Sequence, residues 1–314
     1  MKALILSAGQ GRRLLPLTAD APKCTLPVQD RPLIDWQLSA LAQAGVDEVV
    51  AVVGFRRERV EAVLAARAEP PRVRVLDNPR YAVADNLVSC WMARAEMDDD
   101  FLLLNGDTLF EVDVLRCLLE ASPRPVTLAV DAKPAYDADD MKVTLDGARV
   151  VGIGKHLPPA AAHAESIGML LFRGPGPALF RAGLERAVRT PEAARQWYLS
   201  VIDTLAATGV VWSASVVGRG WVEVDCPSDL EDAERLVATW DANTGTPRER
   251  GPAPRWHHTR ASAASDSAHT HRQSSTESTS TAARGNGITM ASTPSPSRRE
   301  IRPSPSPSES RRSA

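Results

Sequence analysis

The 314-residue sequence is informative first for what it lacks. No apolar run approaches the roughly 20 residues that a membrane-spanning helix needs, so we expect no membrane partner. The segment Met1–Leu6 is too short for the apolar core of a signal peptide and leads directly into a glycine loop. The four cysteines are scattered without a C-x-x-C pair, which argues against a zinc site or a disulfide framework. A cytoplasmic protein is therefore expected.

Aliphatic residues are almost missing from residues 251–314, which hold 15 Ser, seven Thr and seven Pro. Such a segment buries too little apolar surface to offset its ordering entropy, so 241–314 is predicted to be a disordered tail and 1–240 the folded domain. The tail has nine Arg and four acidic residues, a net charge of +5. Subtracting these from 37 basic and 39 acidic residues leaves 28 and 35 in residues 1–250, a net charge of −7. This net negative charge argues against nucleic acid as the main partner of residues 1–250.

Apolar runs and helical periodicities alternate through the first half of the chain. Continuous apolar runs predict buried strands, and apolar residues three and four apart predict amphipathic helices. The predicted order is strand 2–7, helix 32–44, strand 48–53, helix 56–68, strand 73–76, helix 86–95 and strand 101–104. This alternating order predicts an α/β fold, a parallel sheet with helices on both faces.

The second half has closely spaced strand candidates, which we interpret as a small antiparallel insertion beside the main sheet. The complete sheet is thus expected to be mixed but mostly parallel. The predicted elements are strands 126–130, 141–145, 150–153 and 166–172, helices 177–188 and 196–207, strands 210–217 and 221–224, and a Pro-started helix at 227–240.

The loop after the first strand lacks two common phosphate-binding patterns. A dinucleotide fingerprint needs a third glycine where Leu14 stands, which disfavours a nicotinamide-dependent oxidoreductase, and no Gly-Lys-Ser/Thr of a Walker A loop occurs. Arg12 and Arg13 nevertheless lie beside glycines that leave backbone N–H groups open, and Lys23 follows ten residues later. These groups together would form a cradle for a triphosphate. A flexible turn between strand and helix is the alternative.

A longer pattern surrounds this loop. Leu6–Thr18, Pro22–Lys23, Leu26–Val28 and Arg31–Ile34 follow one another in the order of the family segments L-A-A-G-x-G-T/S-R-L, P-K-x-L-x-P-V and G-K/R-P-L-I. The chain thereby resembles the nucleotidyltransferase (sugar-phosphate pyrophosphorylase-like) family over about residues 1–240. It departs from the pattern at Arg12, where Thr or Ser is usual, and at Asp30, where Gly is usual.

The resemblance implies a Rossmann-like, three-layer α/β/α fold. It also implies that the enzyme joins a nucleoside triphosphate (NTP) to a phosphate or phosphonate acceptor and releases pyrophosphate. Arg13 and Lys23 would be catalytic, and the loop residues Ala8, Gly9, Gly11 and Arg12 would bind the nucleotide.

Two carboxylates follow strands that are far apart in the sequence. Asp107 comes directly after the strand 101–104, and Asp225 after the strand 221–224. Asp after Gly commonly caps a turn, but the carboxyl end of a sheet strand is also where α/β proteins bind ligands. Two such carboxylates suit Mg²⁺ bridging phosphate oxygens, and the resemblance implies the same metal-binding role for both residues.

A further resemblance concerns the cytidylyltransferase branch of the family, which acts on phosphocholine and inositol phosphate. Residues 77–81 and 85–89 are similar to its N-P-x-Y/F and N-x-x-S segments, and 140–143 to its E-M-K-V segment. Asn78, Asn86 and Ser89 would then read a pyrimidine base and ribose through paired donors and acceptors. Helix capping at residues 85 and 86 is the alternative.

The acceptor site is predicted from more scattered residues. The family places a lysine at Lys155 to hold the acceptor phosphate, followed by an acid at Glu165, although a lysine in a turn is ordinarily only solvated. Asp131, Tyr136 and Trp197 would add an acidic and aromatic pocket for an ammonium group. Most aromatic residues at such spacing belong to a core instead.

The resulting hypothesis is a Mg²⁺-dependent transferase that moves CMP from CTP to a small acceptor such as phosphocholine, and a homo-oligomer is compatible with it. Inositol phosphate, a small phosphonate and a sugar phosphate are the other acceptors considered. A sugar-1-phosphate uridylyl- or thymidylyltransferase is the first alternative. A non-catalytic, nucleotide-binding regulatory subunit is the second, disfavoured because the charged residues are all present.

Overall fold

A computed structural model describes residues 1–244, and their side chains up to residue 240. The predicted tail lies outside the part whose side chains are described. The last helix, α7 (Pro227–Thr244), starts at the expected proline but extends beyond the expected end at residue 240. No helix within 1–244 combines the length and the apolar character needed to cross a membrane.

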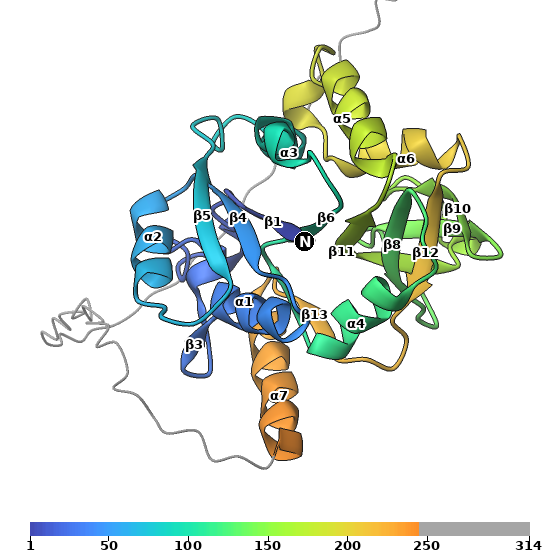
Figure 1. The fold of residues 1–314 in the computed structure, drawn as a ribbon. Helices are drawn as coiled ribbons and strands as arrows, with labels where there is room; N and C mark the ends of the chain where they lie inside the picture. The colour runs from blue at the N-terminus through green and yellow to red at the C-terminus, as the bar shows by residue number, and fades with distance from the viewer. Residues whose placement is uncertain (245–314) are drawn as a thin grey trace, which may run out of the picture. The chain divides into compact units, whose positions relative to one another are not determined.

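A nine-stranded sheet runs through residues 1–244 in the order β5-β4-β1-β6-β11-β8-β12-β10-β9 (Figure 1). Its first four strands are parallel, which confirms the expected parallel half. The strands are β1 (Lys2–Ser7), β4 (Glu48–Val53), β5 (Arg72–Asp77), β6 (Phe101–Asn105), β8 (Val126–Asp131), β9 (Lys142–Asp146), β10 (Arg149–Ile153), β11 (Ala164–Phe172) and β12 (Val211–Ser215).

The strands of the second half continue this sheet, which corrects the expectation that they lie beside it. β11 pairs antiparallel with β6 and β8, and β12 pairs parallel with β8. The cause is the length of β11: its last residues join β6, while Ala164 and Glu165 at its start pair with Val143 and Lys142 of β9. That pairing closes five strands of the second half into a ring.

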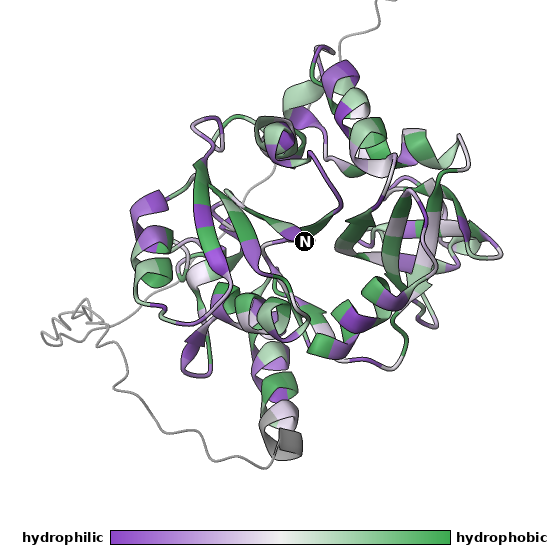
Figure 2. Ribbon diagram, in the orientation of Figure 1, coloured by the Kyte–Doolittle hydropathy of each residue, from purple (hydrophilic) through white to green (hydrophobic). Residues whose placement is uncertain are grey.

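Helices cover both faces of the sheet, as expected (Figure 1). Successive residues of a strand point to opposite faces, so Leu102 and Leu104 pack with one core cluster while Phe101 and Leu103 pack with the other. The central strands are mostly apolar, whereas the helices that flank them carry both apolar and polar residues (Figure 2). The α1 face carries α1 (Leu33–Gln43), α2 (Arg57–Ala65) and α4 (Val112–Glu120), and the α6 face carries α3 (Asn86–Met92), α5 (Gly176–Ala187) and α6 (Leu199–Ala206).

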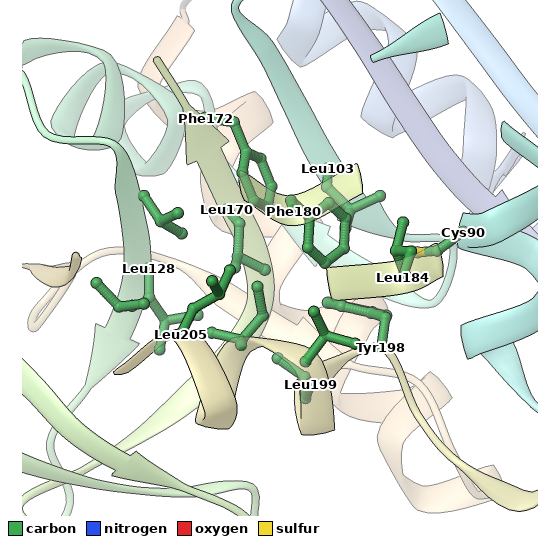
Figure 3. Packing of buried hydrophobic residues seen from close by; sticks show 14 of the residues in the cluster. Cys90, Leu103, Leu128, Leu170, Phe172, Phe180, Leu184, Tyr198, Leu199 and Leu205 are labelled. Carbon is green, nitrogen blue, oxygen red and sulfur yellow. The ribbon is translucent and has the colours of Figure 1, made fainter. Parts of the chain in front are cut away.

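The core of the α6 face is rich in stacked aromatic rings (Figure 3). The Phe172 ring stacks on Phe101 and Phe180, with centroids 4.5 and 4.7 Å apart. Tyr198, at the start of α6, completes this cluster and is fully buried. The expected helix 86–95 is divided here into α3 and a 3₁₀ turn, Ala93–Glu96.

Several short elements were not expected from the sequence. The strand β7 (Thr108–Phe110) pairs antiparallel with β13 (Trp221–Glu223), forming a ribbon separate from the main sheet. Neither β7 nor α4 has a counterpart among the predicted elements. The remaining short elements are the hairpin β2 (Pro27–Val28) and β3 (Arg31–Pro32) and the 3₁₀ turns Arg12–Leu14, Lys23–Thr25, Pro159–Ala161 and Ala193–Arg195.

The carboxyl ends of the parallel strands define one edge of the sheet. Ser7 is paired with Val53, Val53 with Asp77, and Leu6 with Asn105. The chain leaves β1 for β4 on one side, and β6 lies on the other. Such a switch in strand order opens a crevice above the strand ends, where α/β proteins bind ligands.

Candidate active site

The glycine loop after β1 holds its shape through Gly11 and two hydrogen bonds. Gly11 has φ +75°, and a Cβ added there would lie 3.0 Å from the Cβ of Lys23. Thr18 Oγ1 donates to the Gly11 carbonyl at 2.8 Å, and Gln10 Nε2 donates to the Thr18 carbonyl at 3.2 Å. Leu14 anchors the loop in an apolar cluster beneath α7. The loop therefore places its arginines and Lys23 at one edge of the crevice.

Four charged side chains predicted from distant parts of the sequence meet at this edge. Arg13 Nη2 lies 2.6 Å from Asp225 Oδ2. Lys23 Nζ lies 2.5 Å from Asp225 Oδ1 and 2.8 Å from Asp107 Oδ2. We call Arg13, Lys23, Asp107 and Asp225 the ion network. Burial opposes the charge on Lys23, but Asp107 and Asp225 more than offset this effect and raise the pKa of Lys23, so it is a cation at neutral pH.

The β7–β13 ribbon brings the two carboxylates together. Thr108 is paired with Glu223, and the Val224 N–H donates to the Asp107 carbonyl at 2.9 Å. Asp225 then begins the turn into α7, where Asp229 Oδ2 accepts the N–H groups of Asp225 and Cys226. Strand pairing thus holds Asp107, which precedes β7, close to Asp225, which follows β13.

Glu223 is a third carboxylate of this group, which the sequence analysis missed. Oxygens of Asp107, Glu223 and Asp225 all lie within 4.8 Å of one another. Desolvation by surrounding protein, followed by the charges of Asp107 and Asp225, raises the pKa of Glu223 to about 8. The available signal was its spacing: residues two apart on an extended strand point to the same side.

The three carboxylates fit a divalent metal ion. Asp107 Oδ1 is buried and has no hydrogen-bond partner among the described residues. A cluster of carboxylate oxygens is the donor set that hard divalent cations prefer, and a cation among them would relieve their mutual repulsion.

Two of the predicted acceptor residues, Glu165 and Tyr136, belong to a second charged cluster. Lys133 Nζ, which the sequence analysis did not assign, lies 2.8 Å from Asp140 Oδ1 and 2.9 Å from Glu165 Oε2. Burial raises the pKa of Glu165, although Lys133 opposes this change. The Tyr136 ring centroid lies 5.9 Å from Lys133 Nζ, and its hydroxyl accepts the Lys133 N–H at 3.3 Å. Glu165 and Tyr136 are thus brought together by a lysine between them.

Lys155 lies beside Trp197 and Asp139, and its charge acts on Glu223 of the three carboxylates. Its Nζ lies 4.8 Å from the ring centroid of Trp197, which is 40% exposed, and 3.8 Å from Asp139 Oδ1. Its positive charge opposes the rise in the pKa of Glu223. Asp131, at the end of β8, contacts β13, because its Oδ2 accepts the indole N–H of Trp221 at 2.8 Å.

The residues predicted to read the base are bonded to protein groups. Asn78 is fully buried; its Nδ2 donates to Ser89 Oγ at 2.9 Å, and its Oδ1 accepts the Arg80 N–H at 2.9 Å. Asn86 Oδ1 accepts the Tyr198 N–H at 2.9 Å. These bonds shape the loop after β5, and direct contact of the three side chains with a base stays a prediction.

The remaining loop residues differ in their exposure. Ala8 is buried, and its carbonyl accepts the Phe55 N–H at 3.0 Å, which joins the loops after β1 and β4. Gly9 and Arg12 are exposed, and Arg12 makes no ion pair with any residue in the described part of the chain. A Cβ at Gly9 would meet no atom within 4 Å, so the space beside it is open.

The sequence pattern of the MobA-like NTP transferase domain matches residues 3–195, a span that includes Arg13, Lys23 and Asp107. The chain belongs to this family. The resemblance found in the glycine loop and the segments that follow it is thereby confirmed.

Relatives extend the comparison beyond the family. CMP-5'-(3-aminopropyl)phosphonate synthase of Streptomyces rubellomurinus is 32% identical over 243 residues, which cover 74% of this chain and 38% of that protein. The chain spans 38% to 53% of the length of three curated relatives that it matches. What those complete proteins do is therefore not transferred directly to this one.

Solved structures share the fold. The inositol-1-phosphate CTP transferase from T. maritima superposes with a TM-score of 0.64 at 22% identity, covering 76% of this chain and 94% of that chain. UDP-glucose pyrophosphorylase from Acinetobacter baumanii superposes with a TM-score of 0.62 at 19% identity, covering 77% and 98%. Both likenesses support the α/β nucleotidyltransferase fold, and neither separates a cytidylyl- from a uridylyltransferase.

Proposed function

We propose that this protein is a cytidylyltransferase, which transfers CMP from CTP to a small phosphate or phosphonate acceptor and releases pyrophosphate. The observation that carries the proposal is the ion network, where Arg13 and Lys23 meet Asp107 and Asp225 at the strand ends. Cations that face carboxylates in one crevice suit a triphosphate bound together with a divalent cation. Family membership and the CMP-transferring relative support the same reaction.

The reaction requires little acid–base chemistry from the protein. An ionised acceptor oxygen attacks the α-phosphorus of CTP, the bond from this phosphorus to the bridging oxygen breaks, and its electron pair leaves with pyrophosphate. No general base is required because the acceptor oxygen is already ionised at neutral pH. Arg13 and Lys23 stabilise the negative charge that develops on the α-phosphate and on the leaving group. Catalysis is then mainly positioning and electrostatic stabilisation.

Asp107, Glu223 and Asp225 would hold the divalent cation, for which we propose Mg²⁺. When bound, the cation neutralises charge on the phosphate oxygens. Arg12, which is exposed in the same loop as Gly9, would contact the outer phosphates.

The acceptor would lie between Lys155 and the Lys133–Asp140–Glu165 cluster. Lys155 aligns the acceptor phosphate against the α-phosphate, since it lies close enough to influence Glu223. At the other end, Asp131, Glu165 and Tyr136 would combine carboxylates with an aromatic face, a combination that binds ammonium groups, and Trp197 would add a second aromatic face beside Lys155. An amine-bearing acceptor, such as phosphocholine or an aminoalkylphosphonate, is therefore favoured over a neutral sugar phosphate. The sugar-1-phosphate reaction is the second candidate because UDP-glucose pyrophosphorylase shares the fold.

Pyrophosphate release measured for four NTPs against phosphocholine, 3-aminopropylphosphonate, inositol phosphate and glucose 1-phosphate tests the proposal. We expect turnover with CTP and a phosphorylated or phosphonate amine. Turnover only with UTP or dTTP and glucose 1-phosphate would establish the second candidate instead. NTP binding without turnover in every combination would favour a regulatory subunit.

A further inference from the structure

The turn that carries Asp107 is held by buried side chains for which the proposed mechanism has no other use. This turn, Asn105–Thr108, connects β6 to β7, and its Asp107 carboxylate lies near those of Glu223 and Asp225. Its main contacts come from two opposite directions, the α1 face and the α6 face of the sheet.

Gln37 contacts the turn from the α1 face. Its side chain is fully buried, and its Nε2 donates to the carbonyls of Asn105 and Thr108, both at 2.8 Å. One amide group therefore bonds to the residues at both ends of the turn. Because carbonyls only accept hydrogen bonds, the nitrogen must face them, and the amide oxygen is left buried without a partner among the described residues. Gln37 thus fixes the separation of the two turn ends.

Tyr198 contacts the turn from the α6 face. Its hydroxyl donates to Asn105 Oδ1 at 3.1 Å, and its ring packs in the aromatic core (Figure 3). Its N–H is bonded to Asn86, and the preceding residue, Trp197, lies against Lys155. The same short segment therefore contacts both the metal-binding side and the proposed acceptor side.

The turn has no free space in which to adjust. A Cβ at Gly106 would lie 2.6 Å from the Leu6 carbonyl oxygen. Gly168, with φ +73°, lies so close to Asn105 that a Cβ there would be 2.7 Å from the Asn105 Cγ. Thr108 Oγ1 also donates to the Ile167 carbonyl at 3.2 Å. Packing thus limits the conformations open to the turn, and the hydrogen bonds of Gln37 and Tyr198 select the one that it adopts.

We propose that Gln37 and Tyr198 are positioning residues, which hold Asp107 at the geometry needed for divalent metal binding. This inference rests on the proposed function, in which Asp107 is a metal ligand. Neither residue touches the substrates; each acts through the turn. Groups that orient a metal ligand commonly change metal affinity or activity by about 10- to 100-fold when they are removed.

The test uses Gln37→Met, which keeps the shape of the side chain but removes both donors, and Tyr198→Phe, which removes only the hydroxyl. Gln43→Met is the matched control, because Gln43 is exposed at the end of the same helix. Binding of Mn²⁺ alone is measured by electron paramagnetic resonance, and kcat and KM are measured separately. We expect the Mn²⁺ dissociation constant to rise about tenfold or more in Gln37→Met and less in Tyr198→Phe. We also expect kcat to fall, the acceptor KM to stay unchanged, and Gln43→Met to match the wild type.

A folded Gln37→Met protein with wild-type Mn²⁺ affinity would overturn the inference, as would a wild-type protein that binds no Mn²⁺. If Gln37→Met does not fold, the Mn²⁺ affinity of Tyr198→Phe is compared with that of the wild type, and an unchanged affinity would overturn the inference. The two proposals fail separately. If the protein transfers no CMP but its variants bind Mn²⁺ more weakly than the wild type, the proposed function is contradicted and the positioning role is not. If the variants transfer CMP normally and bind Mn²⁺ as tightly as the wild type, the positioning role is contradicted and the proposed function is not.

Discussion

At the scale of single residues, Gly9 and Gly11 differ in what a side chain would meet. Gly11 has a left-handed backbone and lies against Lys23, whereas a Cβ at Gly9 would enter open space. We expect Gly11→Ala to lower the free energy of unfolding by about 1–2 kcal/mol and to reduce kcat by displacing Lys23. Gly9→Ala should unfold like the wild type but raise the KM for CTP, because its methyl group enters the proposed phosphate site. Thermal unfolding and steady-state kinetics measure both effects. An unchanged KM for CTP in Gly9→Ala would contradict a triphosphate site at this loop.

Asp107 offers the most direct test of the ion network. Asp107→Ala is expected to fold normally while kcat for pyrophosphate release falls by about 10²–10³ or more, because a preorganised electrostatic partner is lost. Asp113→Ala, at an exposed position of α4, is the control and should keep wild-type turnover. Near-normal turnover in Asp107→Ala would refute the metal assignment.

The predicted residues that the structure brings together belong to ordered sequence motifs, and their roles stay predictions. Arg13, Lys23, Asp107 and Asp225 were chosen from the sequence, and the structure brings them within hydrogen-bond distance of one another. Gln37 could not be predicted, because a glutamine in an amphipathic helix has no feature that reveals two bonds to a turn far along the chain. Lys133 was missed for a similar reason, since its role depends on the pairing of β11 with β8 and β9.

At the scale of elements, local patterns explain the success of the parallel half. β1, β4 and β6 contain continuous apolar runs, and helices separate the four strands along the chain, so order and direction follow from the sequence. β7 was missed because three residues form a strand only through pairing with the distant β13. The course of β11 was also unpredictable, because its two ends pair with different neighbours.

The amino end of β1 is joined to its surroundings by an ion cluster around Glu96. Lys2 Nζ and Arg74 Nη2 lie 3.1 and 2.7 Å from Glu96 Oε2. Hydrogen bonds from Arg74, and then from Lys2, lower the pKa of Glu96 despite its partial burial. The stabilising effect is therefore complete above the unfolded pKa of about 4.3 and is lost as the pH falls through the lower folded value.

Glu96→Gln should accordingly reduce the free energy of unfolding by about 1–2 kcal/mol at pH 7. The difference from the wild type should shrink as the pH falls below the unfolded pKa of about 4.3, and it should disappear once the pH is low enough to protonate Glu96 in the folded state as well. Urea unfolding at a series of pH values measures it, with the exposed Glu58→Gln as a control that should have no effect. A difference that persists at low pH would show that the charge of Glu96 is not its cause.

At the scale of the whole described domain, the two halves of the sheet have different proposed tasks. The parallel half presents the glycine loop and Asp107 at its strand ends, and the second half presents Lys155, Asp131 and the Lys133 cluster. The halves are joined by the β6–β11 pairing and by β13, which carries Trp221 and Glu223 between them. Nucleotide and acceptor would therefore meet above the centre of the sheet.

We propose above all that this site joins CMP to the phosphorus group of an acceptor. Phosphorus NMR of the protein with CTP, Mg²⁺ and either phosphocholine or 3-aminopropylphosphonate tests it directly, because each phosphorus atom is followed without a coupling enzyme. We predict pyrophosphate together with a coupled pair of resonances from the new phosphorus anhydride, absent with Asp107→Ala. The proposed reaction would be contradicted if CTP stays unchanged with both acceptors. It would also be contradicted if the same pattern forms only with UTP or dTTP and glucose 1-phosphate.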